Sequence, residues 1–449
     1  MVVDLRITNA KVFMRERIIE CGVAADDGVI VKIAKTSHLP PANKTVDANG
    51  LLLVPGLVDA HVHLRDMQFA HKEDFYTGTS AAAAGGFTTL LDMPNTPPIT
   101  DSAERLREKK DVASRLAVVN VGFYAALPRS IDEMDSLVEE GAVAFKVHLL
   151  KKWTELNIDD FGVLMQAVSK AGSLGRPVTF HAEDRATIEP EALRLKNQGR
   201  NSVSDFLAAH SDESEWSAVA KIISLSTSRA HLHVCHVSSE RSVAMVRDAR
   251  RSGSKITLEV TPHHMFLDSS VLAKRGTEAL TEPPIRSRSN NQDLFRYLLD
   301  GSIDIVASDH APHSIEEKKF STVWDAPPGI AGLETVVPLL LTKVNLGELS
   351  ITRFVEIASS VPAELFHLQT KGRIWEKYDA DLTLIDLYRE EKVDASQFKS
   401  KAKFSPFDGM KVRGFVAKTF VKGALVMEDA EVYAKPGSGT IIGGPEREY

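Results

Sequence analysis

The chain begins and ends with short alternating apolar runs. Leu5-Arg6-Ile7 is typical of the first 54 residues, where turn residues such as Asp26-Asp27-Gly28 separate the runs. The same alternation returns beyond residue 371, for example in residues 414–421. Alternation between turn signals is typical of small antiparallel sheets. We expect residues 1–54 and 371–434 to pair into one accessory β domain, followed by a loosely held tail at 435–449.

Between residues 55 and 370, apolar β-rich runs alternate with helical stretches. The expected strands are 57–64, 87–93, 116–123, 143–149, 177–181, 230–237, 255–260 and 303–308, and the expected helices include 103–115, 131–140, 161–171, 217–226, 239–251 and 291–299. About eight strand–helix units predict an α/β fold with a parallel (β/α)₈ barrel of the TIM type. A doubly wound open sheet is the alternative, but no glycine-rich phosphate motif supports it.

Length, charge and composition limit the kinds of binding partner and the cellular compartment that we expect for this protein. The 449 residues suit one barrel and a smaller domain, and the formal net charge of −7 argues against nucleic acid as the main partner. The two cysteines, Cys21 and Cys235, cannot form a disulfide framework and fit a reducing compartment. No stretch approaches the roughly 18 apolar residues that a membrane span needs, and the first residues lack a signal-peptide pattern. We expect a cytoplasmic protein.

Metal-binding residue types fall where the predicted strands end. In His61-Val62-His63 the two imidazoles are two residues apart, so on a strand both point to the same side. His181 and His236 end two further strands, and Asp309 follows the last one. A lone histidine in such a position is more often a hydrogen-bonded core residue. The C-terminal ends of barrel strands meet at one rim, however, so the whole set favours a site for one or two zinc ions.

Lys146 lies inside an apolar strand. The ordinary interpretation is an edge position or a long side chain that reaches solvent. Pointing inward, its ammonium would be costly unless its charge were altered. Carbamylation by carbon dioxide alters it, because the product is a carboxylate that can bridge two metals.

These motifs resemble the amidohydrolase superfamily, in its cyclic amidase branch of dihydroorotases, hydantoinases and allantoinases. The likeness covers nearly the whole chain, and Asp59-Ala60-His61-Val62-His63 matches the family's Asp-x-His-x-His. The resemblance implies a barrel of the amidohydrolase type with a β-sandwich formed by both chain ends. It implies two zinc ions per subunit bridged by carbamylated Lys146, and Asp309 as the catalytic carboxylate. The implied metal ligands are His61, His63, Lys146, His181, His236 and Asp309.

Three further residues favour the dihydroorotase type. Arg65, in His63-Leu64-Arg65-Asp66, stands where dihydroorotases bind the substrate carboxylate, which a guanidinium matches in shape and charge. Asn95 and His313 match further substrate contacts of that type. Without the resemblance, Arg65 would be read as a surface ion-pair partner and Asn95 as a turn residue. The implied reaction is reversible zinc-dependent hydrolysis of (S)-dihydroorotate to N-carbamoyl-L-aspartate, in de novo pyrimidine (UMP) synthesis.

The chain also departs from the family pattern. Met67-Gln68 stands where Pro-Gly is frequent, and Glu282 precedes Pro283-Pro284-Ile285-Arg286 where an asparagine is frequent. If residue 282 faces the substrate, its carboxylate would repel an anionic ligand. A hydantoinase- or allantoinase-type cyclic amidase is therefore an alternative, and a catalytically silent scaffold, for instance for a carbamoyltransferase partner, is another. The sequence also leaves a homo-oligomer open.

Overall fold

The centre of the protein is a sheet of eight parallel strands. The computed structural model describes residues 2–227 and 229–443. The strands are β6 (Leu57–Val62), β7 (Phe87–Asp92), β8 (Asn120–Ala126), β9 (Ala142–His148), β10 (Val178–His181), β11 (Leu232–Val234), β12 (Ile256–Val260) and β13 (Ile305–Val306). They follow one another in sequence order across the sheet. Val62 also pairs in parallel with His310, just beyond β13, so the sheet nearly closes on itself and the predicted barrel is confirmed.

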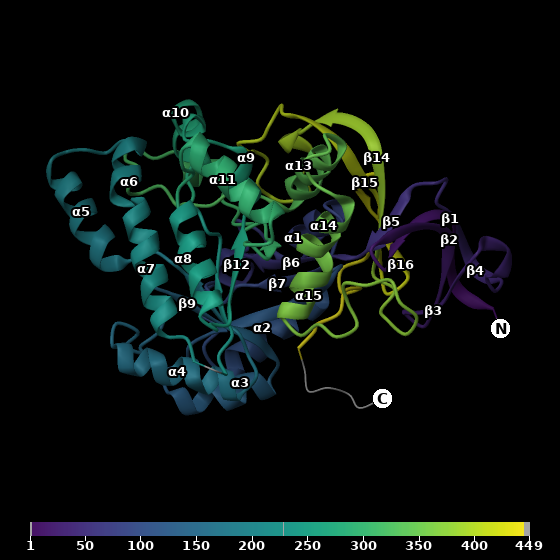
Figure 1. Ribbon diagram of the computed structural model, residues 1–449, viewed down its shortest axis with the longest axis horizontal. Helices are drawn as coiled ribbons and strands as arrows, with labels where there is room; N and C mark the ends of the chain where they lie inside the picture. The colour runs from purple at the N-terminus through teal and green to yellow at the C-terminus, as the bar shows by residue number, and fades with distance from the viewer. Residues whose placement is uncertain (1, 228, 444–449) are drawn as a thin grey trace.

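At least one helix separates each barrel strand from the next, and Figure 1 shows the larger helices arranged around the strands. The helices are α1 (Phe75–Ala84), α2 (Ala103–Leu116), α3 (Met134–Glu139), α4 (Phe161–Ser173), α5 (Arg185–Asn197), α6 (Val203–Ala209), α7 (Asp212–Ser224), α8 (Glu240–Arg251), α9 (Pro262–Phe266), α10 (Ser270–Arg275), α11 (Arg288–Leu299), α12 (Ile315–Lys318), α13 (Leu333–Asn345), α14 (Ile351–Val355) and α15 (Val361–Leu365). The first helix begins with a capping box, in which Asp74 and Thr77 bond reciprocally.

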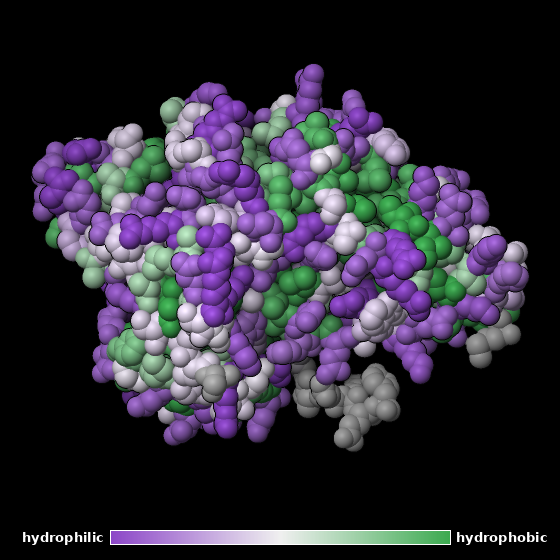
Figure 2. Space-filling model, in the orientation of Figure 1, coloured by the Kyte–Doolittle hydropathy of each residue, from purple (hydrophilic) through white to green (hydrophobic). Residues whose placement is uncertain are grey.

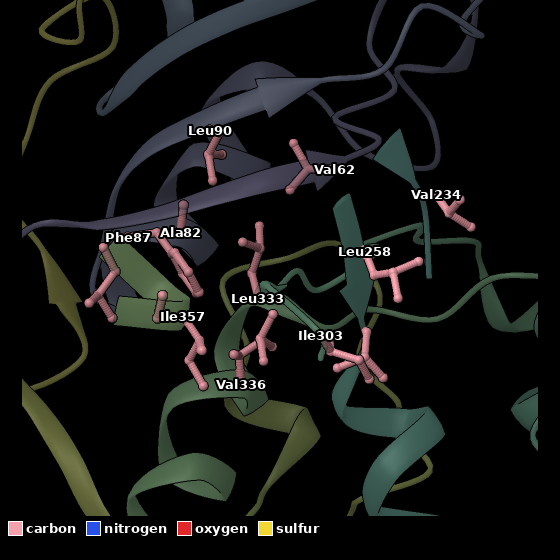
Figure 3. Close-up of a cluster of buried hydrophobic side chains, with 14 of the residues drawn as sticks. Val62, Ala82, Phe87, Leu90, Val234, Leu258, Ile303, Leu333, Val336 and Ile357 are labelled. Atoms are coloured by element: carbon pink, nitrogen blue, oxygen red, sulfur yellow. The ribbon is translucent and has the colours of Figure 1, made fainter. Parts of the chain in front are cut away.

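The barrel strands and the helices share one large apolar core. Val62 on β6 and Leu90 on β7 lie near Leu333 and Val336 of α13, with Ile357 beside them (Figure 3). All five side chains are buried. Each contributes roughly 1.5–3 kcal/mol relative to an exposed position, which fixes the strands on which the functional groups are mounted.

Both chain ends form a second sheet. Its strands are β1 (Val3–Met14), β2 (Arg17–Asp26), β3 (Val29–Ala34), β4 (Ala42–Asp47), β5 (Leu52–Pro55), β14 (Leu382–Lys392), β15 (Lys411–Val421), β16 (Ala424–Glu428) and β17 (Glu431–Val432). β14 pairs with β5 and so joins the two ends, as predicted. The expectation of purely antiparallel pairing is wrong for β4 and β5. These two strands run one after the other along the same edge of the long β1, in parallel with it.

The segment before the C-terminus lies beside the start of β8. The amide of Gly439 donates to the carbonyl of Ala117 at 2.8 Å, and the amide of Ile442 donates to the carbonyl of Val121 at 2.9 Å. These bonds hold part of the region expected to be a loose tail. Residues 444–449 of that tail lie outside the described residues.

Hydrophilic side chains cover much of the face shown in Figure 2, with apolar side chains between them. Within residues 2–227 and 229–443, no helix has both the length and the apolar character needed to span a membrane.

A buried ion-pair network joins the barrel to the second sheet. The ammonium of Lys371 lies 2.6 Å from Asp381 Oδ2 and 2.9 Å from Asp379 Oδ2. Asn120, at the start of β8, donates to the same oxygen of Asp381 at 2.8 Å. Burial opposes the charge of Lys371, but the two carboxylates raise the pKa of its ammonium above the ordinary value.

We expect Lys371→Met to lower the free energy of unfolding by about 3 kcal/mol, because it leaves the buried carboxylate of Asp381 and the half-buried carboxylate of Asp379 without their cation. Urea denaturation at neutral pH measures this. Arg194→Met is the matched control, since it breaks an exposed ion pair with Glu191 and should change stability by less than about 0.5 kcal/mol. Equal losses in the two variants would contradict the role of the buried network.

Candidate active site at the strand ends

A pocket of about 220 Å³ opens at the C-terminal ends of the barrel strands. Its lining includes all nine residues that the sequence singled out: His61, His63, Arg65, Asn95, Lys146, His181, His236, Asp309 and His313. They come from segments spread along the chain, and the parallel barrel brings them to one rim.

One cluster of donor atoms comes from the first and last barrel strands. His61 lies near the C-terminal end of β6, and His63 comes directly after that strand. Asp309 comes shortly after β13. Oδ1 of Asp309 lies 3.5 Å from Nε2 of His61 and 3.3 Å from Nε2 of His63. Two imidazole nitrogens and a carboxylate oxygen therefore converge on one small space, which is the donor chemistry that Zn²⁺ prefers.

A second pair of imidazoles lies beside the first cluster. Nδ1 of His181, at the end of β10, is 3.2 Å from Nε2 of His236, which follows β11. The rings of His61 and His236 are 5.2 Å apart, so the two clusters adjoin. Lys146 on β9 is buried next to them, with its Nζ 2.8 Å from Sγ of Cys235. The side chain of Lys146 therefore points into the barrel and does not reach solvent at an edge.

Glu259 on β12 supports this arrangement, and the sequence reasoning missed it. Its carboxylate forms a short contact with Nδ1 of His61 and accepts from the His236 amide at 3.1 Å. His233 Nε2 lies 3.1 Å from its other oxygen. The sequence contains a signal for Glu259, because it is a single charged residue inside an apolar strand, as Lys146 is.

Similar partners fix two of the other imidazoles. Nε2 of His181 lies 2.7 Å from Glu183, whose second oxygen lies 2.8 Å from His210. Nδ1 of His63 lies 2.7 Å from Oδ1 of Asn95. In each case the outer ring nitrogen is bonded, so the inner nitrogen is left to face the pocket. Such outer partners set the tautomer and orientation of metal-binding histidines.

Several residues at the rim adopt strained backbone conformations. The φ angles are +59° at Arg65, +36° at His236 and +46° at Asp309. Non-glycine residues rarely adopt positive φ, and such strain persists only where the surroundings enforce it. Near Arg65, the carboxylate of Asp92 accepts from the amide of Leu64 at 2.7 Å and so anchors the turn.

Burial and neighbouring groups shift the protonation of the donor atoms, and His61 differs from the rest. Burial opposes its charge, but the carboxylate of Glu259 raises the pKa of His61 to about 10, so this imidazole must release a proton when it binds a metal. Burial lowers the pKa of His63 to about 4 and holds the pKa of His236 well below its ordinary value, so both imidazoles are neutral. Burial opposes ionisation of Asp309, but His61 and His63 hold the pKa of its carboxyl below the ordinary value. Neutral imidazoles and an ionised carboxylate are the ligand forms that metals require, and His63, His236 and Asp309 already have them. The donor set therefore fits a metal centre whose formation displaces a proton from His61.

A buried guanidinium shares the pocket with these groups. Arg65 donates from Nε to the carbonyl of Pro312 at 3.2 Å, and its Nη2 lies 3.2 Å from Nε2 of His313. Burial lowers the pKa of Arg65 to about 10, which leaves it a cation at neutral pH. Within the described residues, no carboxylate oxygen lies within 4.0 Å of its nitrogens. A buried cation with only neutral hydrogen-bond partners has the charge and the free N–H donors that are suited to an anion.

Other lining residues had no sequence signal for a place in the site. Lys151 and Trp153 come from the loop after β9, and Phe69 comes from the loop after β6. Loop residues of this kind lack the periodicity that placed the histidines. Glu282, noted above as a departure from the family pattern, also lines the pocket.

Comparisons with known proteins agree on the family. The model of the amidohydrolase family matches residues 52–426. The chain is 37% identical to a dihydroorotase of Methanothermobacter thermautotrophicus, over 98% of this chain and 97% of the relative. It is 38% identical to a dihydroorotase of Bacillus cytotoxicus, over 92% and 95% respectively.

Among solved structures, the L-hydantoinase (dihydropyrimidinase) of Arthrobacter aurescens superposes with a TM-score of 0.93 at 31% identity, over 98% of this chain and all of that one. A D-hydantoinase of a Thermus species gives 0.91 at 26% identity, over 98% and 99%. Family model, relatives and fold all point the same way, and the chain belongs to the amidohydrolase family.

Proposed function

We propose that the protein is a dihydroorotase, which hydrolyses (S)-dihydroorotate reversibly to N-carbamoyl-L-aspartate in pyrimidine synthesis. The observation that carries the proposal is Arg65, a buried cation with no carboxylate partner among the described residues, in the same pocket as the imidazole cluster. Dihydroorotate carries one carboxylate on its ring, and the rings of hydantoin and dihydrouracil carry none. The dihydroorotase relatives, at 37% and 38% identity, support the same substrate.

The donor sets support two zinc ions. His61, His63 and Asp309 would hold one, and His181 and His236 would hold the other, with carbamylated Lys146 as the bridge. Zinc at such a site lowers the pKa of water towards neutrality and polarises a carbonyl. Carbamylation also accounts for a lysine buried among metal-ligand side chains, since it replaces a cation with an anion.

The chain's own residues would orient the substrate and move one proton. Arg65, Asn95 and His313 hold the ring carboxylate, which places the ring amide beside Asp309. Asp309 is ionised, so it accepts the proton of the attacking water as the oxygen bonds to the amide carbon. It then delivers that proton to the ring nitrogen as the C–N bond breaks. The atoms balance, with one water consumed for each ring opened.

Two other functions fit parts of the site. A hydantoinase-type activity is favoured by the superposition on hydantoinase structures. It would leave Arg65 without an anion to bind, because the hydantoin ring carries no carboxylate. A silent scaffold is disfavoured, because all six implied metal-ligand residues are present and line one pocket. Association with a carbamoyltransferase or with a second copy of the chain is compatible with the proposal and is not needed for it.

The first test is turnover by the purified protein loaded with zinc. We expect conversion of dihydroorotate and of N-carbamoyl-aspartate, and loss of both on chelation, because the reaction depends on the metal. Hydantoin, dihydrouracil and allantoin serve as uncharged controls. Turnover of an uncharged ring in place of dihydroorotate would retain the metal site and overturn the substrate assignment. Bound zinc with no turnover of any ring would favour the scaffold.

We expect Asp309→Asn to lower kcat about 10³-fold, because it removes the proton acceptor and keeps the side-chain shape. Metal analysis of the same sample distinguishes the proton-transfer role from a ligand role. Retained zinc with lost turnover supports proton transfer. Loss of zinc together with activity would make Asp309 chiefly a ligand.

We expect Arg65→Met to lower kcat/KM for dihydroorotate about 100-fold, because the substrate carboxylate would lose its buried cation. Steady-state kinetics measures this, with metal content checked in parallel. Arg105→Met, which breaks an exposed ion pair with Asp101, is the control and should leave the kinetics unchanged. Unaltered kinetics in the Arg65 variant would refute its role.

A further inference from the structure

A second charged pair lines the pocket. The carboxylate of Glu282 forms a short ion pair through Oε2 with the ammonium of Lys151. The carboxyl side chain is 11% exposed, whereas the lysine side chain is 48% exposed. Glu282 stands where an asparagine is frequent in the family that the chain resembles, and the metal chemistry does not explain its pairing with Lys151.

His148 lies close to the same carboxylate. Its Nδ1 accepts the amide of Lys151 at 3.1 Å, so the neutral ring carries its proton on Nε2. That nitrogen faces Oε2 of Glu282 at 3.9 Å. The ring of His148 also stacks on His181 with centroids 3.8 Å apart. Glu282 is therefore held beside the second imidazole pair.

Both contacts involve the same oxygen of Glu282. No hydrogen bond or ion pair is formed by Oε1 with any other described residue, and the side chain lines the pocket. A carboxylate oxygen accepts hydrogen bonds and cannot donate them. The complementary ligand group is an N–H, and a cyclic ureide carries N–H groups beside its carbonyls.

The charge of Glu282 is compensated where it stands. Lys151 cancels it at contact distance, so a ligand anion held by Arg65 meets little net repulsion from this part of the pocket. The carboxylate at position 282 is therefore compatible with an anionic ring in the pocket. The acceptor remains available although the charge is balanced.

We propose that Glu282 determines ring specificity: its Oε1 accepts a hydrogen bond from a ring N–H of the bound cyclic ureide, and Lys151 neutralises the carboxylate so that the ring can carry an anion. The inference rests on the proposed function for the identity of the anionic ring. The recognition of a ureide N–H by Glu282 can be tested on any ring that the protein opens.

The first experiment compares Glu282→Ala with Glu282→Gln in steady-state assays with dihydroorotate. The alanine variant removes the acceptor and should raise KM about tenfold, the effect of losing one hydrogen bond to a charged group. The glutamine variant retains an acceptor oxygen and should stay within about threefold of the parent protein. Equal effects of the two variants would overturn the acceptor role.

The second experiment tests the charge balance. Lys151→Met leaves Glu282 as an uncompensated anion and should raise KM about tenfold for dihydroorotate, and further for N-carbamoyl-aspartate, which carries two carboxylates. Adding Glu282→Gln should reverse the increase. If Lys151 instead binds the substrate anion directly, the double variant will be as impaired as the single one, which would overturn the proposal.

Matched controls separate these effects from damage to the fold. Lys152→Met breaks a neighbouring exposed ion pair with Asp159, and Glu278→Ala removes an acid that does not line the pocket. Both should leave KM unchanged, and each variant is checked for melting temperature and zinc content. If the parent protein opens only uncharged rings, the proposed function fails, and the two Glu282 variants are then assayed with that ring.

Discussion

The site depends on one constraint: a buried charge is costly unless another group compensates it, and that group can belong to the protein or to a ligand. His61 is compensated by Glu259, and His181 by Glu183, and neither acid lines the pocket. Each acid occupies the outer nitrogen of its histidine and leaves the inner nitrogen facing the cavity. The metal chemistry proposed for the pocket is therefore set by carboxylates behind it. The anion site is anchored in the same way, since Lys109 on α2 pairs with Asp92, which bonds the Leu64 amide next to Arg65.

The sequence could predict those parts of the molecule that follow a repeated pattern. The barrel strands were placed within a few residues of their observed bounds, because apolar runs recur with helices between them. Helix α1 was not among the helices named from the sequence, since Phe75–Ala84 has little contrast between polar and apolar positions. The parallel pairing of β4 and β5 was also missed. Alternation shows that a segment is a strand, but the direction of its partner depends on the connections between strands.

The same distinction holds within the site. The pocket brings together all nine residues chosen from the sequence, because their strand-end positions and the family motifs agreed. The roles assigned to them stay predictions. Glu259 could have been recognised by the argument used for Lys146. The pairing of Lys151 with Glu282 could not, because it joins two loops 131 residues apart, and no local pattern relates them. Long-range charge pairing is visible only once the fold is known.

The ion pair between Lys151 and Glu282 affects the distribution of charge in the pocket. Four lysine and arginine side chains line the pocket, and one of them, Lys146, is the residue proposed to be carbamylated. Lys72 is matched by Glu317 and Lys151 by Glu282. Arg65 has only neutral hydrogen-bond partners. A paired ammonium and carboxylate act as a dipole, whose field falls off faster with distance than that of a single charge. The anionic group of a ligand is therefore drawn to Arg65. An asymmetric ring bound there has one orientation in which its carboxylate meets the guanidinium and an N–H meets Glu282, so the balanced pair selects the orientation without competing for the anion.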